Sequence, residues 1–142
     1  MLVEAILKTK GREVVTIAET AKLDEAAHLL DANAIGALVV TDTRRQPVAV
    51  LSERDIVREM ALHGAAALTR PVSQAMTPAF VTARPDATLN ELMVLMTDRR
   101  VRHVPVMDGD TMLGIVSIGD IVKSKIADME AEAAALQAYI SS

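Results

Sequence analysis

Apolar and polar residues follow two periods along the chain, and the same succession of periods occurs twice. The helical spacing i, i+3, i+4, i+7 appears once in each half, at Leu23, Ala26, Ala27 and Leu30 and at Leu89, Leu92, Met93 and Met96. Two pairs of short β-branched segments follow, residues 37–41 with 47–51 and residues 103–107 with 112–116. Polar turns, TDTRRQ and DGDT, separate the members of each pair, so each pair predicts a β-hairpin.

Comparing the two halves shows an internal repeat. Shifted by 66 residues, positions between 15 and 42 match positions between 81 and 108. Beyond the hairpin turn the shift becomes 65, and LSERDIV (51–57) falls on VSIGDIV (116–122). One residue lost in a turn leaves the flanking elements in phase, so both halves are expected to fold alike.

Each half predicts the order β-α-β-β-α. The first strand is expected at 13–17 or 79–83, and a second helix is expected after Ser52 or Ser117. A unit of roughly 55–60 residues buries too little surface by itself. We therefore expect the two halves to pack together in an α/β (α+β) fold.

The pattern divides the chain into four segments. Residues 1–62 form the first repeat, 63–76 a linker, 77–127 the second repeat and 128–142 a helical tail rich in Ala and Glu. The tail carries a thin apolar stripe, whose members are Met129, Ala133, Leu136 and Ile140. Either the tail lies on its own domain or it contacts a partner helix in an oligomer, and the sequence leaves both open.

Composition narrows the class of protein. Hydrophobic residues make up 51% and aromatic residues 1%, so the core is aliphatic and base stacking on aromatic side chains is not expected. The net charge is −4 and no basic stretch is dense enough for nucleic acid or a membrane surface. The chain has no Cys, no signal-peptide pattern at its start and no apolar run near the roughly 20 residues that span a bilayer. We expect a cytoplasmic protein.

Three segments carry a resemblance to a known family. They are GALVVTDTRRQPVAVLSERDIV (36–57), VSQAMTP (72–78) and RHVPVMDGDTMLGIVSIGDIV (102–122). From about Arg12 to Ile126 the chain resembles a tandem pair of CBS (cystathionine β-synthase) domains, a Bateman module. The resemblance implies two β-α-β-β-α repeats related by pseudo-two-fold symmetry, plus a C-terminal helix. It also implies an adenosyl ligand, such as AMP, ADP, ATP, NAD or S-adenosylmethionine, in the cleft between the repeats.

The repeated Ser-x-x-Asp motif has two interpretations. Ser52 with Asp55, and Ser117 with Asp120, have the spacing of a helix capping box. A helix N-terminus also attracts phosphate. The resemblance implies that the two aspartates hold ribose and that the two serines lie beside the sugar-phosphate.

Basic residues near these motifs are candidate phosphate ligands. The resemblance implies this role for Arg102 and His103. Arg54, inside the first motif, is a further candidate, and Lys22 is a weaker one. The resemblance places adenine in an apolar slot on the strands, formed by Ile17, Ala18, Leu38 and Val39 in one site and by Ala83, Val104 and Pro105 in the other. Each slot residue is also a plausible core residue.

The two halves differ at three of these positions. Gly36, Val39 and Ala49 stand in the first half where Arg102, Pro105 and Gly114 stand in the second. We therefore expect two non-equivalent sites, with doubt about full occupancy of both.

No catalytic or metal-binding pattern stands out. No His has a metal-ligand spacing, and neither motif serine has an expected base beside it. The expected function is a non-enzymatic sensor that binds an adenine nucleotide and signals to an unknown protein partner. The resemblance implies a homodimer whose contact surfaces would be the second helices, 55–62 and 120–127. The alternative is a ligand-free structural module for interaction or oligomerisation.

Overall fold

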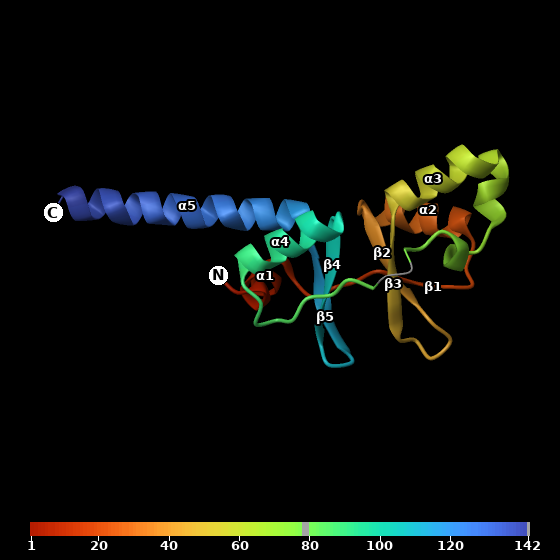
Figure 1. The fold of residues 1–142 in the computed structure, drawn as a ribbon, viewed down its shortest axis with the longest axis horizontal. Helices are drawn as coiled ribbons and strands as arrows, with labels where there is room; N and C mark the ends of the chain where they lie inside the picture. Colours follow the sequence, from red (N-terminus) through yellow and green to blue (C-terminus); the bar gives the residue numbers. More distant parts are fainter. Residues whose placement is uncertain (78–79, 142) are drawn as a thin grey trace. The chain divides into compact units, whose positions relative to one another are not determined.

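The computed structural model describes residues 1–77 and 80–141 and places them in two compact units (Figure 1). The first unit is Glu13–Val81, and the second unit combines Met1–Arg12 with Thr82–Ser142. The sequence had assigned residues 1–62 to the first repeat. The first twelve residues thus pack with the second repeat.

The first unit has the expected order of elements. They are β1 (Thr16–Ala18), α2 (Leu23–Asn33), β2 (Ala37–Thr41), β3 (Pro47–Ser52), α3 (Glu53–His63) and the 3-10 turns η1 (Gly64–Thr69) and η2 (Val72–Gln74). The sheet order is β1-β2-β3, with β1 parallel and β3 antiparallel to β2. The first strand begins three residues later than the pattern predicted.

The core of the first unit is the apolar stripe of α2 packed on one face of this sheet. Its members include Leu23, Ala26, Leu30, Leu38, Val40, Ala49, Leu51 and Ile56. Alternate residues of β2 and β3 point toward α2 because side chains alternate across a strand. The core is aliphatic, as the composition predicts.

The second unit has a similar order of elements, but the described part of its first strand forms only a single bridge. Its elements are α1 (Val3–Lys10), α4 (Leu89–Arg99), β4 (His103–Asp108), β5 (Thr111–Ser117) and α5 (Ile118–Ser141). Strands β4 and β5 form a two-stranded antiparallel sheet. The strand expected at 79–83 lies partly outside the described residues. Its described part makes one parallel bridge, from Ala83 to Val106.

Helix α1 is an element that the sequence pattern did not predict. Its backbone is tied to the second unit, because Val3 N donates to Ala87 O at 2.8 Å and Leu89 N donates to Met1 O at 2.9 Å. The spacing of Val3, Ile6 and Leu7 fits an amphipathic helix, and all three are buried. This spacing was the signal that could have revealed α1.

The same anchoring occurs in the first unit, with the segment before η2. Val72 N donates to Ala21 O at 2.7 Å and Leu23 N donates to Arg70 O at 3.0 Å. The acceptor Ala21 lies 66 residues before Ala87, so the two anchors are equivalent. Each repeat is therefore completed by the segment that precedes the other repeat in sequence.

Packing of α1 explains why Gly114 differs from Ala49. A Cβ built on Gly114 would lie 2.7 Å from Leu7 Cδ2, and Leu7 is 1% exposed. The buried Ala49 stands at the corresponding place in the first unit, where Met76 packs against the core in the position equivalent to Leu7. The difference, which the sequence related to ligand binding, thus has a packing cause.

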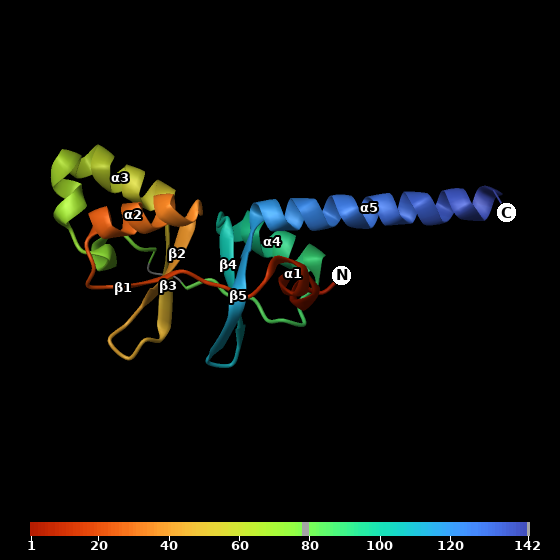
Figure 2. The same ribbon diagram turned by 180° about the vertical axis from the view of Figure 1, so that it is seen from behind.

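The expected C-terminal tail is continuous with the second helix of its repeat. Helix α5 runs for 24 residues and its distal half extends beyond α1 and α4 (Figure 2). Ile121 is the residue of α5 that is buried, whereas residues 133–141 are all exposed. The alternative in which the tail lies on its own domain is therefore wrong for its distal part. Among the described helices, none is long and apolar enough to cross a membrane.

Candidate functional site

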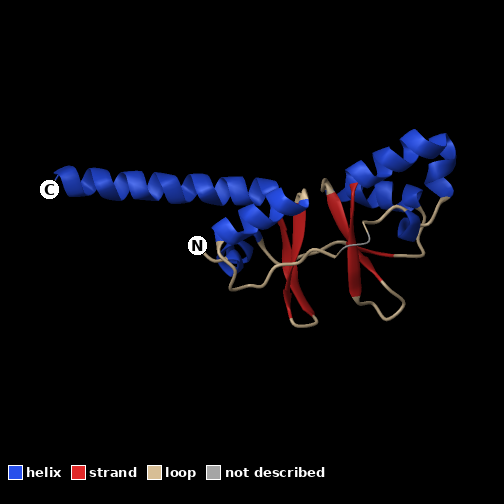
Figure 3. Ribbon diagram, in the orientation of Figure 1, coloured by secondary structure: helices blue, strands red, loops and turns tan. Residues whose placement is uncertain are grey.

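The Ser-x-x-Asp motif of the second unit stands where β5 passes directly into α5 (Figure 3). The Ser117 hydroxyl donates to Asp120 Oδ2 at 2.9 Å, and Ser117 N donates to the same oxygen at 2.8 Å. The Asp120 backbone N–H donates back to Ser117 Oγ at 3.2 Å. The motif is thus a capping box, and it fixes a carboxylate at a helix N-terminus.

Lys10 of α1 reaches this carboxylate. Its Nζ lies 2.6 Å from Asp120 Oδ2 and donates a second bond to Ile115 O at 2.7 Å. Sequence reasoning missed Lys10, because 110 positions separate it from Asp120 and helix α1 was not predicted. Asp120 Oδ1 accepts no bond within the described part of its unit, and the Asp120 side chain is 23% exposed.

The pKa of Asp120 lies below its ordinary value. Partial burial would raise this pKa, but hydrogen bonds from Lys10 and Ser117 and the positive charge of Lys10 outweigh burial. The carboxylate is therefore ionised at neutral pH. An ionised carboxylate with an open oxygen can accept hydrogen bonds from hydroxyl groups.

Replacing Lys10 with methionine should raise the pKa of Asp120 and reduce the acid sensitivity of folding. A carboxyl whose pKa is lowered in the folded state stabilises the fold above its unfolded pKa of about 3.9, and this is lost as pH falls through the lower folded pKa. Urea unfolding between pH 2 and pH 6 should show a shallower fall in the variant. An unchanged pH slope, with Lys8→Met as the matched control, would contradict the role of Lys10.

Two basic residues lie beside the same helix start. Ile118 N donates to Arg102 O at 2.9 Å, and His103 pairs with Ser117 across the hairpin. Arg102 is exposed. The structure thus brings Arg102, His103, Ser117 and Asp120 together at the start of α5 and adds Lys10, and their binding of a nucleotide stays a prediction.

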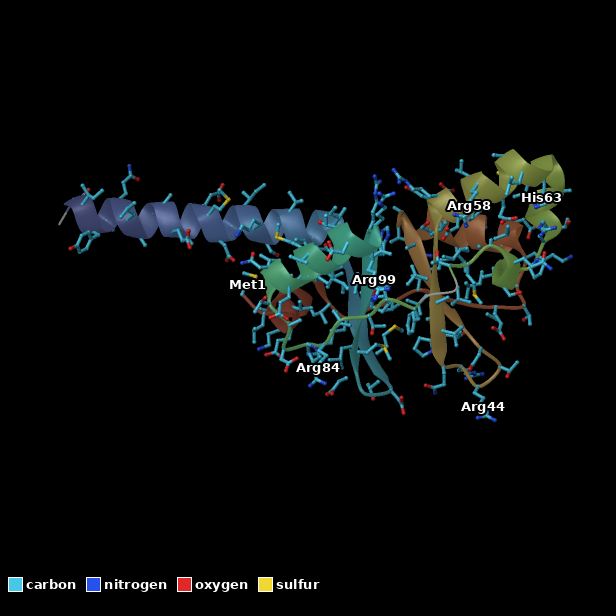
Figure 4. All side chains as sticks on the ribbon, in the orientation of Figure 1. Met1, Arg44, Arg58, His63, Arg84 and Arg99 are labelled. Carbon is cyan, nitrogen blue, oxygen red and sulfur yellow. The ribbon has the colours of Figure 1, made fainter. Side chains whose placement is uncertain are left out.

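The first unit closes the equivalent motif more tightly. Ser52 N and Ser52 Oγ donate to Asp55 Oδ2 at 2.8 and 3.1 Å. Arg58, labelled in Figure 4, donates from one nitrogen to Asp55 Oδ1 at 3.0 Å and to Ala75 O at 3.1 Å. Asp55 is 5% exposed, and both its oxygens have protein partners. Gly36 O accepts a hydrogen bond from Glu53 N at 3.0 Å, and Arg102 O is the equivalent acceptor in the second unit.

Replacing Ser52 with alanine should destabilise the first unit by about 1 kcal/mol, because the helix loses its N-cap and Asp55 loses the hydroxyl partner. Chemical unfolding in urea measures this cost. Arg54→Ala, an exposed residue in the same turn with no bond in the described structure, is the control and should change stability by less than about 0.5 kcal/mol. Equal effects would argue against the cap.

Lys22 and Arg54 are placed differently from each other. Arg54 is exposed on the first turn of α3, close to the motif. Lys22 is the N-cap of α2, and Gly36 follows the other end of that eleven-residue helix. A rise of 1.5 Å per residue puts these ends about 16 Å apart. The structure therefore does not bring Lys22 to the motif.

The residues expected to form adenine slots separate into two groups. Leu38 and Val104 are fully buried within the cores of their own units. Val39 and Pro105 are also buried, but on the opposite face of their strands, outside those clusters.

The remaining slot residues belong to the first strand of each repeat. Ile17 is a core residue, Ala18 is exposed, and Ala83 bridges to Val106. The assignment of these residues to adenine slots stays a prediction.

A surface hollow of about 510 Å³ lies elsewhere on the second unit. It is lined by Met1, Thr88, Leu89, Asn90, Lys125, Asp128, Met129, Ala131 and Glu132. None of the expected site residues lines it, and its two carboxylates would repel phosphate. Residues 1–77 and 80–141 contain no cluster of three or more His, Asp and Glu that could hold a metal ion.

The profile of the CBS domain matches this sequence twice, at residues 3–62 and 72–126. The chain belongs to the CBS domain family. Two copies in tandem confirm the resemblance drawn from the repeated motif, and the mixed α/β architecture agrees with it. The first match includes α1, although α1 packs with the second CBS repeat.

Three similar proteins illustrate the range of this family. The crystal structure of the CBS-domain protein ATU1752 from Agrobacterium tumefaciens has 44% identity and a TM-score of 0.84, covering 87% of this chain and 92% of that one. The protein PAE2072 from Pyrobaculum aerophilum, crystallised with AMP, has 30% identity and a TM-score of 0.74, covering 84% and 89%. A mitochondrial protein of Arabidopsis thaliana, CBSX3, is 36% identical over 110 residues; the match covers 75% of this chain and 53% of CBSX3.

Proposed function

We propose that this CBS pair is a regulatory module that binds an adenine nucleotide, with AMP as the first candidate. The observation that carries the proposal is the ionised Asp120, held at the start of α5 with Oδ1 open. A ribose presents two neighbouring hydroxyls, which such a carboxylate can accept. The AMP complex of PAE2072 supports the same ligand class.

The surroundings of Asp120 suit the rest of a nucleotide. The N-terminus of a 24-residue helix and the exposed guanidinium of Arg102 favour a phosphate. Lys10 adds a second positive charge beside the carboxylate. The apolar face that carries Pro105 supplies a surface for adenine. That the ligand lies in a cleft between the repeats stays a prediction.

The first repeat is the weaker candidate site. Asp55 already uses both oxygens, and Gly36 replaces the arginine of the second repeat. We propose that the second repeat takes the first nucleotide and that the first repeat binds more weakly or serves as a scaffold. This contrast favours the ligand-free alternative for one site only.

Binding would act through a change in conformation or assembly that an unknown protein partner reads. Such coupling requires that the two states bind the nucleotide with different affinity. The exposed apolar residues of the second helices, Val57 and Met60 on α3 and Val122 and Ile126 on α5, support the expected homodimer. The proposed role is regulatory and not catalytic.

The test is thermal unfolding with AMP, ADP, ATP, NAD and S-adenosylmethionine, each compared with GMP. A ligand at about 100 times its Kd adds about 2.7 kcal/mol, on the order of 8 °C in Tm for a chain of this size. A rise with one adenosyl compound and none with GMP supports the proposal and identifies the ligand. No rise with any adenosyl compound at millimolar concentration would overturn it.

A further inference from the structure

One apolar surface of α5 is covered by nothing in its own unit. Its residues alternate in steps of four and three along the helix: Val122, Ile126, Met129, Ala133, Leu136 and Ile140. The exposed fractions of the five large members are 52%, 51%, 58%, 61% and 74% in that order. We call this set the α5 stripe.

Most of the α5 stripe lies away from the side of α5 that packs on its own unit, and only Met129 also lines the hollow beside the start of α4. Ile121, 2% exposed, marks the packed side. Val122 is one residue further along and therefore points about 100° away around the helix. A second helix on the stripe would not have to take the place of α1 or α4.

The step of four and three is the heptad pattern of a coiled coil. Ile126, Ala133 and Ile140 take the a positions, and Val122, Met129 and Leu136 take the d positions. β-Branched residues at a combined with Leu at d favour two parallel strands, and the helix meets this rule in part, with Ile at two of its three a positions and Leu at one of its three d positions. The small Ala133 makes the central layer the weakest.

Charges beside the stripe select the partner and its direction. Lys125 occupies a g position and Glu130 the next e position. In a parallel pair these residues face each other across the two-fold axis, in both directions. An antiparallel pair with full overlap would instead place Glu130 opposite a second Glu130, and Glu132 opposite a second Glu132. A helix that complements itself only in parallel fits a second copy of this chain.

We propose that α5 forms a parallel two-stranded coiled coil with α5 of a second copy of this chain, over residues 122–140. The pairing joins two CBS pairs side by side through the second repeat. It deepens the homodimer of the proposed function, but it does not depend on nucleotide binding, so its test can fail while the test of nucleotide binding succeeds.

Cysteine cross-linking tests this contact directly, because the chain has no Cys of its own. In a parallel coil, Leu136 faces Leu136 of the second copy. Oxidised Leu136→Cys should therefore give at least tenfold more covalent dimer than Ala138→Cys, which is also exposed but lies on the far side of the coil. Equal yields from the two variants would overturn the proposal. Cross-linking of Leu136→Cys only when mixed with Ile126→Cys would indicate antiparallel helices and would also overturn it.

Charge exchange gives an independent test by sedimentation equilibrium without nucleotide. Lys125→Glu alone and Glu130→Lys alone should each raise the dimer dissociation constant about tenfold, because like charges then face each other. An equimolar mixture of the two single variants should restore the affinity, since one chain then offers Glu at both positions and the other Lys. No recovery in the mixture, or no effect of either single change, would contradict the parallel pairing. Circular dichroism of each variant checks that α5 remains helical.

Discussion

Replacing Asp120 with asparagine should weaken AMP binding about 10- to 100-fold. The amide keeps the size of the carboxylate but loses the charge that strengthens hydrogen bonds from ribose hydroxyls, each worth about 1.5–3 kcal/mol to a charged acceptor. The variant also leaves Lys10 without its ion-pair partner, so its fold alone should be less stable. The decisive measurement is therefore the AMP-induced rise in Tm, relative to the variant without ligand.

Asp55→Asn is the matched control for this experiment. It removes the same charge from the equivalent position, but Arg58 and Ser52 already occupy that carboxylate. We expect it to reduce stability and to change AMP affinity less than threefold. If Asp55→Asn abolished the AMP response and Asp120→Asn left it intact, our assignment of the stronger site would be reversed. Loss of response in both variants would indicate one ligand that needs both repeats.

Replacing Leu7 with alanine should destabilise the second unit by about 2–5 kcal/mol, the range for removing a buried leucine side chain. Leu7 is 1% exposed and belongs to the core that also contains Val104, Val106 and Val116. Urea unfolding would measure this loss. The matched control is Leu2→Ala, because Leu2 precedes the same helix but is 39% exposed.

Gly114→Ala should cost about 1–3 kcal/mol in the wild-type background, since the new methyl group meets Leu7 Cδ2 at 2.7 Å. In the Leu7→Ala background the same change should cost much less, because the obstructing side chain has been removed. The double-mutant cycle would then show a coupling of about 1 kcal/mol or more between the two sites. Strictly additive losses of stability would show that the Leu7 side chain can move away from a methyl group at position 114. Leu7 would then not require glycine there.

The sequence predicted the repeated units well because each repeat is encoded locally. Helix α2 and its equivalent α4 begin at the first residue of the predicted spacing and end three residues beyond it, and the strands of both hairpins lie within one residue of the predicted positions. The Ser-x-x-Asp spacing also predicted the capping boxes, which depend on contacts three residues apart. Local patterns are sufficient for such elements.

The parts that sequence reasoning missed depend on contacts between distant segments. Lys10 and Asp120 are 110 positions apart, and Leu7 and Gly114 are 107 apart. These pairs come together only because α1 packs on the second repeat. The sequence also did not predict that Asp55 and Asp120 differ in their hydrogen-bond partners, because Arg58 bonds to one and Lys10 to the other.

Because α1 belongs to the second unit, the whole first unit lies between two segments of the second unit in the sequence. The second unit cannot be completed until residues 1–12 have closed a loop that contains the entire first unit. Closing such a long loop slows folding, and the second unit is therefore expected to be completed late. A tether or a mechanical load applied at the N-terminus would also act first on the unit that lies farther along the chain.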